Sequence, residues 1–159
     1  MVKVETLILE GKVSKIKELE LPRYANFFEN SYKDNLEHSK TVKGSFPKWA
    51  IISGYYAMHD ITKLLLAKKF RLKIELEVHA TTIKVLNELI HNKHLLEMIE
   101  NGYREFLFLA NDLAEAKKER VKTQYFTGTD YMKEEYRKKS DEFLKNIVEP
   151  YIEKIRSLL

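Results

Sequence analysis

Arg120 is a charged residue on a helical stripe that is otherwise apolar. Phe106, Leu113 and Arg120 follow one another at intervals of seven, and Gln124 extends the same line. A guanidinium group in this position could hold a phosphate through two parallel hydrogen bonds. The alternative is a side chain that reaches from the end of a helix into water while its methylene groups cover apolar neighbours.

A second group of polar residues lies within the most hydrophobic segment, over residues 47–68. Ser53, Tyr56, Asp60 and Lys63 are spaced by three and four residues, so they share one face of a helix. Because a buried polar group without a partner costs about 1–3 kcal/mol, this stripe requires hydrogen-bonding partners. The other interpretation is that the stripe faces water or a second copy of the chain.

Two stretches concentrate basic side chains, although the net charge of the chain is only +4. Such stretches are typical of solvated helix faces, and a modest net charge permits contact with nucleic acid without requiring it. The first stretch contains Lys117, Lys118, Arg120 and Lys122, and the second contains Arg137, Lys138 and Lys139.

The histidines do not form a convincing metal site. Glu88 and His91 give one E-x-x-H pair, with His94 close behind, but a di-iron bundle requires a second such pair and further glutamates. We therefore expect no metal and no cofactor. His38 and His59 are interpreted as ordinary core or surface residues. The chain also lacks cysteine, a phosphate-binding glycine loop and a serine triad.

Length and composition indicate one domain over residues 1–159. A chain of 159 residues can bury a core without disulfides, and five glycines with three prolines favour long helices. The N-terminus is too short and too charged in its apolar part for a signal peptide, and no apolar run is long enough to span a bilayer. The expected location is the cytoplasm.

The spacing of apolar residues predicts an all-α fold, an up-and-down bundle of four main helices with an N-terminal extension over 1–21. Residues 1–9 are expected to form a short strand or an extended arm. Pro22 should open the first long helix, which Gly44 ends. Ser45 is a candidate cap before Pro47 starts the next helix, over about 47–68, which is apolar nearly all round and therefore central.

The second half of the chain predicts three more helical segments. One covers about 76–96, and another starts after a break at Asn101-Gly102 and reaches about residue 125, unless a single helix continues through that point. Asp130 is a candidate N-cap for the last helix, in which Pro150 should cause a kink or a restart.

Several of these segments resemble one subgroup of the HEPN (higher eukaryotes and prokaryotes nucleotide-binding) family. The resemblance rests on the helix "KWAIISGYYAMHDITKLLLAKKF", the later "ELEVHATTIKVL" with its histidine, Arg120-Val-Lys-Thr-Gln-Tyr125, and the last helix "KKSDEFLKNIVEPYIEKI". Their order and spacing match over roughly residues 25–158. The resemblance implies a helical homodimer, and in catalytic relatives an R-x4-6-H motif at the dimer interface serves a metal-independent ribonuclease. Here Tyr125 stands in the place of that histidine and Val121 follows the arginine.

The resemblance implies a toxin–antitoxin-like protein that binds or cleaves RNA or binds a nucleotide, with a minimal nucleotidyltransferase antitoxin as a partner. Arg120 and Tyr125 are then the candidate catalytic pair, with Arg120 on phosphate. The alternative is a noncatalytic helical interaction module in which Arg120 and Tyr125 form a structural pair. His79 holds the family's histidine position, and either contacts Arg120 or caps its helix. The full set of candidate RNA- or nucleotide-binding residues is Arg120, Lys117, Lys122, Gln124 and His79.

Overall fold

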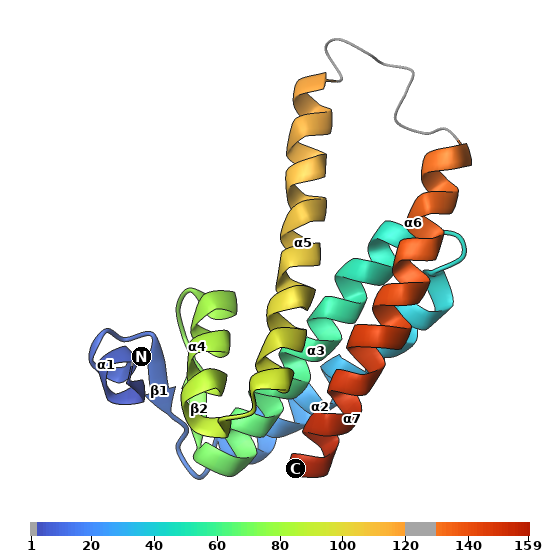
Figure 1. The fold of residues 1–159 in the computed structure, drawn as a ribbon. Helices are drawn as coiled ribbons and strands as arrows, with labels where there is room; N and C mark the ends of the chain where they lie inside the picture. Colours follow the sequence, from blue (N-terminus) through green and yellow to red (C-terminus); the bar gives the residue numbers. More distant parts are fainter. Residues whose placement is uncertain (1–2, 120–129) are drawn as a thin grey trace.

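The computed structural model describes residues 3–119 and 130–159, and the side chains of residues 3–109 and 133–159. Most of this chain is helical, as expected, and one small two-stranded sheet is added (Figure 1). The elements in chain order are α1 (Val4–Leu9), β1 (Val13–Lys15), α2 (Leu21–Val42), α3 (Pro47–Phe70), β2 (Leu72–Ile74), α4 (Val78–Ile90), α5 (Lys93–Glu119), α6 (Asp130–Phe143), the π-helix η1 (Leu144–Val148) and α7 (Glu149–Leu158).

The N-terminal segment differs from the prediction. The expectation of a strand or extended arm over residues 1–9 is wrong, because Val4 and Leu7 are spaced for one helix face and are both buried on α1. The strand comes later, where β1 pairs antiparallel with β2 and Val13 lies opposite Ile74. This segment closes a second, smaller core cluster, formed by Val4, Leu7, Val13, Leu66, Leu72, Ile74 and Val85.

Helices α2 and α3 begin close to the prolines that were predicted to start them. Pro22 lies in the first turn of α2, and Pro47 is the first residue of α3. The N-cap of α3 is Phe46, however, and Ser45 does not cap it. Helix α3 is buried on nearly every side, as its composition predicts. Gly54 permits this packing, since a Cβ there would lie 3.1 Å from Val148 and 3.2 Å from the hydroxyl of Ser39.

The break in the next helical segment lies earlier than predicted. Helix α4 ends at Ile90, and His91 adopts the left-handed conformation with φ 46°. The side-chain oxygen of Asn92 then accepts a hydrogen bond of 3.0 Å from the backbone N–H of Leu95, an N-terminal capping contact that the sequence prediction overlooked. Helix α5 continues through Asn101-Gly102, so the alternative of a continuous helix is correct at that point.

The C-terminal helical segment changes its winding before Pro150. Helix α6 begins at Asp130, whose side chain lies outside the described set, and gives way to η1. Pro150 then lies in the first turn of α7, where its missing N–H is tolerated. The expectation was a kink or a restart at this proline, and the structure shows a change of winding within a helical backbone that is uninterrupted from α6 through η1 to α7.

Helix α3 occupies the centre of the arrangement and contacts α2, α4, α5, α6 and α7. Figure 1 shows that α2 and α5 run in one direction, whereas α3 and the α6–α7 segment run in the other. Helix α4, α1 and the sheet gather at the lower end of α5, as drawn. Within the described residues, no helix is long and apolar enough to cross a membrane.

Candidate functional site

Most of the sequence-predicted site lies outside the described residues. Lys117 is part of α5, but its side chain is not described. His79 is the one candidate whose side chain can be placed. The candidates outside the described residues are Arg120, Lys122, Gln124 and Tyr125.

His79 lies in the first turn of α4 and joins that helix to α3. Its Nδ1 lies 2.7 Å from the hydroxyl of Tyr55, at hydrogen-bonding distance. Its ring stacks on Tyr103 at 5.4 Å, with an interplanar angle of 13°, and on Phe106 at 5.5 Å. His79 therefore does not cap α4, whose N-terminus has no side-chain cap.

The burial of this pair holds both side chains in their neutral forms. Burial lowers the pKa of His79, and the nearby ammonium of Lys63 lowers it further. Burial also raises the pKa of Tyr55 well above its ordinary value, with nearby tyrosines adding to the effect. At neutral pH the contact joins a phenol to a neutral imidazole.

His59 lies one turn after Tyr55 on α3, and its ring centroid is 4.8 Å from that of His79. Its Nε2 lies 3.3 Å from the hydroxyl of Thr82, which itself donates to the backbone oxygen of Val78. The hydroxyl proton of Thr82 is thereby used, so Nε2 of His59 is the donor in this contact. Burial lowers the pKa of His59 to about 3, helped by Lys63 and His79, so this imidazole is neutral too.

The second nitrogen of His59 is buried without a hydrogen bond in the described part of the chain. It lies 3.9 Å from a carboxylate oxygen of Asp60, beyond hydrogen-bonding range. The hydroxyl of Ser31 donates to the other oxygen of Asp60 at 2.6 Å, and the amide of Asn35 donates to it at 3.0 Å. Burial raises the pKa of Asp60, while these hydrogen bonds and Lys63 oppose the rise.

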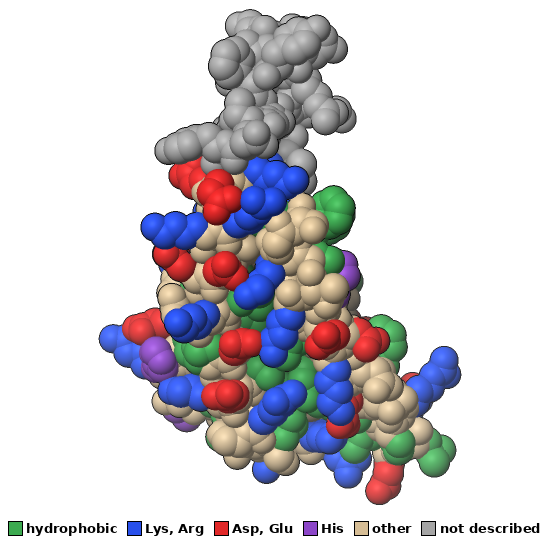
Figure 2. Space-filling view, turned by 90° about the vertical axis from the view of Figure 1, so that its right-hand side faces the viewer, with side chains coloured by type: hydrophobic (Ala, Val, Ile, Leu, Met, Phe, Trp, Pro, Cys, Tyr) green, Lys and Arg blue, Asp and Glu red, His purple; other side chains and the backbone are tan. Residues whose placement is uncertain are grey.

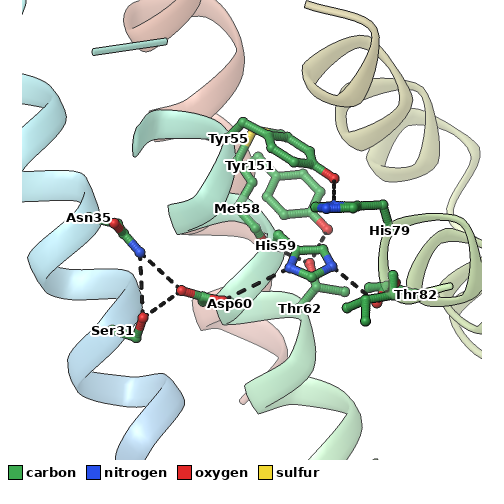
Figure 3. A network of polar contacts seen from close by, with 11 residues as sticks. Ser31, Asn35, Tyr55, Met58, His59, Asp60, Thr62, His79, Thr82 and Tyr151 are labelled. Carbon is green, nitrogen blue, oxygen red and sulfur yellow. Dashed lines mark hydrogen bonds and ion pairs between the residues drawn. The ribbon is translucent and has the colours of Figure 1, made fainter. Parts of the chain in front are cut away.

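Two members of the polar stripe of α3, Ser53 and Asp60, thus find hydrogen-bonding partners on α2. Besides the contacts of Asp60, the hydroxyl of Ser53 lies 2.6 Å from Nδ1 of His38. Figure 3 shows Asp60 turned toward Ser31 and Asn35, on the opposite side of α3 from His79 and Thr82. The interpretation that the whole stripe faces water or a second copy is wrong for Ser53 and Asp60, because both are buried against α2.

Tyr56 and Lys63, the other two members of the stripe, are half-buried. The ring of Tyr56 meets His79 and Phe106 edge to face, with centroid distances of 6.1 and 5.6 Å. The ammonium of Lys63 lies over the ring of Phe28 at 4.9 Å and forms no ion pair within the described residues. Burial lowers the pKa of Lys63, which Asp60 opposes.

His79 and Lys117 lie far apart within one protomer. Lys117 lies eleven residues beyond Phe106 on α5 (117 minus 106), which is roughly 16 Å along the helix axis. Tyr103 and Phe106, which stack on His79, belong to the part of α5 that packs on α3 and α4. His79 and Lys117 therefore belong to two different regions of the described chain.

The second basic stretch is engaged in contacts within the fold. Arg137 donates to the backbone oxygen of Gly44 at 2.7 Å and pairs with Glu134. Lys139 pairs with Glu105 at 2.9 Å and lies over the ring of Phe108. Figure 2 shows basic and acidic side chains interspersed on the face seen from the right-hand side of Figure 1, without one large region of a single sign.

The E-x-x-H pair is divided by the end of a helix. Glu88 lies on α4, whereas His91 lies in the turn after it and His94 lies on α5. One carboxylate oxygen of Glu88 is buried without a hydrogen bond among described residues. In that same part of the chain, no group of three histidine, aspartate or glutamate side chains could hold a metal ion.

Sequence reasoning missed the ring cluster around His79. Its members are Tyr55, Tyr56, His59, His79, Tyr103 and Phe106. The adjacent tyrosines of "SGYYAMHD" are the one local signal that drew attention to α3, but nothing in the spacing connects them with α4. A comparison with protein-family models, curated proteins and solved structures finds no match.

Proposed function

We propose that the chain is a HEPN-type protein of a toxin–antitoxin-like system that binds RNA or a nucleotide. The direction of its helices supports an up-and-down four-helix bundle made of α2, α3, α5 and the α6–α7 segment, with α4 and the N-terminal elements as additions. This arrangement agrees with the family resemblance of the "SGYYAMHD" helix, which is the central α3.

The observation that carries the proposal is the engagement of the second basic stretch within the fold. Arg137 and Lys139 already have partners there, so the second stretch has less charge available for a ligand. The first stretch begins at Lys117, near the end of α5. We assign phosphate binding to this first stretch, with Arg120 as the bidentate contact and Gln124 and Tyr125 as neighbouring hydrogen-bonding groups.

Binding is favoured over cleavage because of Tyr125. The R-x4-6-H motif of catalytic relatives uses an imidazole, whose pKa near 6.5 suits proton transfer at neutral pH. A phenol with a pKa of about 10 remains protonated there and serves as a hydrogen-bond donor. In this proposal Arg120 and Tyr125 hold the ligand, and a slow metal-independent cleavage is the secondary expectation.

The proposal includes a homodimer, with a small nucleotidyltransferase as a further partner. Several large apolar side chains of the bundle are exposed, among them Phe46 at 61%, Trp49 at 59% and Phe108 at 50%. Exposed aromatic side chains of this size are enriched at protein interfaces. A noncatalytic dimer module that partners a nucleotidyltransferase is the alternative, and these side chains serve it equally well.

The decisive experiment measures RNA binding by filter retention at two salt concentrations. Arg120→Ala should weaken binding at least tenfold and reduce its dependence on salt, while the midpoint of thermal unfolding changes little. Arg104→Ala is the matched control, because Arg104 is an exposed arginine on α5 and makes no ion pair within the described chain. Unchanged RNA binding by Arg120→Ala, or a large loss of thermal stability instead, would contradict the assignment.

A further inference from the structure

The hydrogen bond between Tyr55 and His79 has a defined direction. The side chain of Tyr55 is fully buried, and His79 is its only hydrogen-bonding partner among described residues. If the ring N–H of His79 were the donor, the phenol proton would be buried without an acceptor, which is the more costly arrangement. The phenol of Tyr55 therefore donates to Nδ1.

This direction determines which nitrogen of His79 carries the proton. A neutral imidazole has one N–H, and with Nδ1 accepting from Tyr55 that proton lies on Nε2. Nε2 makes no hydrogen bond within the described chain, and His79 is half-buried, so part of the residue remains accessible to solvent. We infer that this N–H is a fixed hydrogen-bond donor available to a ligand.

Two further donors come from the polar stripe of α3 and have no acceptor among described residues. The hydroxyl of Tyr56 makes no hydrogen bond there, and its ring forms a corner with the rings of His79 and Phe106. The ammonium of Lys63 lies over the ring of Phe28 on α2, forms no ion pair in the same part of the chain, and lowers the pKa of His79. The carboxylate of Asp60 is turned toward Ser31 and Asn35 on α2 (Figure 3).

We propose that His79, Tyr56, Phe106 and Lys63 form a nucleotide subsite separate from the basic stretch at the end of α5. The base lies against the rings of Tyr56 and Phe106, Nε2–H of His79 donates to an oxygen of the ligand, and Lys63 attracts the phosphate. The rings of Tyr56 and Phe106 are half-buried and keep part of their surface accessible, which suits a base, and a group of donors without an acceptor among described residues suits an oxygen-rich anion. Tyr55 is a positioning residue, since it acts through the imidazole. The subsite rests on the proposed function but predicts a second contact about 16 Å from the basic stretch, measured along α5.

The first test reads the imidazole of the full-length protein directly by long-range proton–nitrogen NMR. At about pH 7.5, His79 should show the Nε2–H tautomer alone. Tyr55→Phe keeps the ring contacts but removes the donor, so this variant should show both tautomers. A pure Nδ1–H tautomer in the unaltered protein would overturn the proposal.

The second test titrates the same protein with each of the four nucleoside monophosphates, and separately with inorganic phosphate and with adenosine. At least one monophosphate should shift the signals of His79 and Tyr56 in a saturable way, more strongly than phosphate or adenosine at the same concentration. Equal shifts with inorganic phosphate would overturn the stacked base, and the absence of a shift with all four monophosphates would overturn the subsite.

A matched pair of variants separates the donor from the ring. His79→Gln places an amide N–H near the position of Nε2 and should retain most of the affinity, whereas His79→Phe keeps a ring without a donor and should bind about tenfold more weakly. Equal affinity of His79→Phe and the unaltered protein, with melts showing both to be folded, would contradict the role of His79. Arg120→Ala should leave the nucleotide shift at His79 intact. Loss of RNA binding in that variant, with no shift at His79 in any protein, would leave the proposed function standing and reject the subsite alone.

Discussion

The hydroxyl of Tyr55 lies 2.7 Å from Nδ1 of His79, and this contact joins the central helix α3 to the first turn of α4. It sits within stacked rings from α3, α4 and α5, and the adjacent His59 connects it with Thr82. The contact therefore has consequences for stability that can be measured without any ligand.

Replacement of Tyr55 by phenylalanine should lower the free energy of unfolding by about 1 kcal/mol. The ring contacts remain, whereas Nδ1 of His79 loses one hydrogen bond. Urea unfolding gives the value. Tyr103→Phe is the control, since the hydroxyl of Tyr103 makes no hydrogen bond in the described structure, and it should change the free energy by less than about 0.5 kcal/mol. Equal effects of the two variants would mean that the Tyr55 contact adds no stability.

His59 should make the protein less stable as the pH falls below about 6.5. Its pKa is about 3 in the folded chain and 6.5 when unperturbed, so between these values the unfolded chain binds a proton that the folded chain does not. The free energy of unfolding then falls by up to about 1.4 kcal/mol per pH unit, and this contribution is fully present only above pH 6.5. Asp60, whose pKa is raised by burial, acts with the opposite sign, and His79 acts with the same sign.

The comparison that isolates His59 is a series of urea titrations from pH 7.5 to pH 4 on the unaltered protein and on His59→Leu. The free energy of unfolding of the unaltered protein should change with pH more steeply than that of His59→Leu. In the middle of this range the difference should approach the uptake of one proton on unfolding. Parallel curves would show that His59 titrates equally in the folded and unfolded chains.

Asp60 offers a test of charge against hydrogen bonding. Asp60→Asn should change the free energy of unfolding at pH 8 by less than about 1 kcal/mol, because the amide oxygen can still accept from Ser31 and a buried charge is removed. Asp60→Leu should cost about 2–3 kcal/mol, since Ser31 and Asn35 lose their acceptor. Similar losses for both variants would show that the charge itself stabilises the fold.

Gly54 sets how closely α3 approaches its neighbours. In Gly54→Ala the new Cβ would lie 3.1 Å from Val148 and 3.3 Å from Phe143, so we expect a loss of about 1–3 kcal/mol. Gly44→Ala is the matched control, because its Cβ would meet nothing within 4 Å, and it should be neutral within about 0.5 kcal/mol. Thermal melts of the two variants test this difference. If Gly54→Ala does not lower the stability, the helices around Gly54 can move apart without an energetic cost.

The proposed dimer predicts a mass near twice that of one chain by sedimentation at micromolar concentration. Trp49→Glu places a charge on an exposed aromatic position and should shift the protein toward monomer without loss of helical signal. Lys48→Glu, at an exposed neighbouring position, is the control for the added negative charge. A monomer in the unaltered protein would reject the dimer, and an unaffected dimer in Trp49→Glu would place its interface elsewhere.

Local periodicity and the positions of proline were enough to predict the main helices. The apolar residues of α2 and α3 repeat at helical spacing, and Pro22, Pro47 and Pro150 each lie in the first turn of a helix. The all-round apolar composition of α3 was enough to predict that it is central. These signals are contained within a few turns of chain, so they do not depend on neighbouring elements.

Other features depend on contacts between segments that are distant in the chain, and no local pattern reveals them. Strand β1 forms because β2 supplies its hydrogen bonds. In the polar stripe of α3, Asp60 and Ser53 have their hydrogen-bonding partners on α2. The pairing of Tyr55 with His79 depends on the left-handed turn at Glu77 and on the packing of α4 beside α5, neither of which leaves a periodic signal. Periodicity tells which face of a helix is buried, whereas the atom that meets a buried phenol is set by how three helices approach one another.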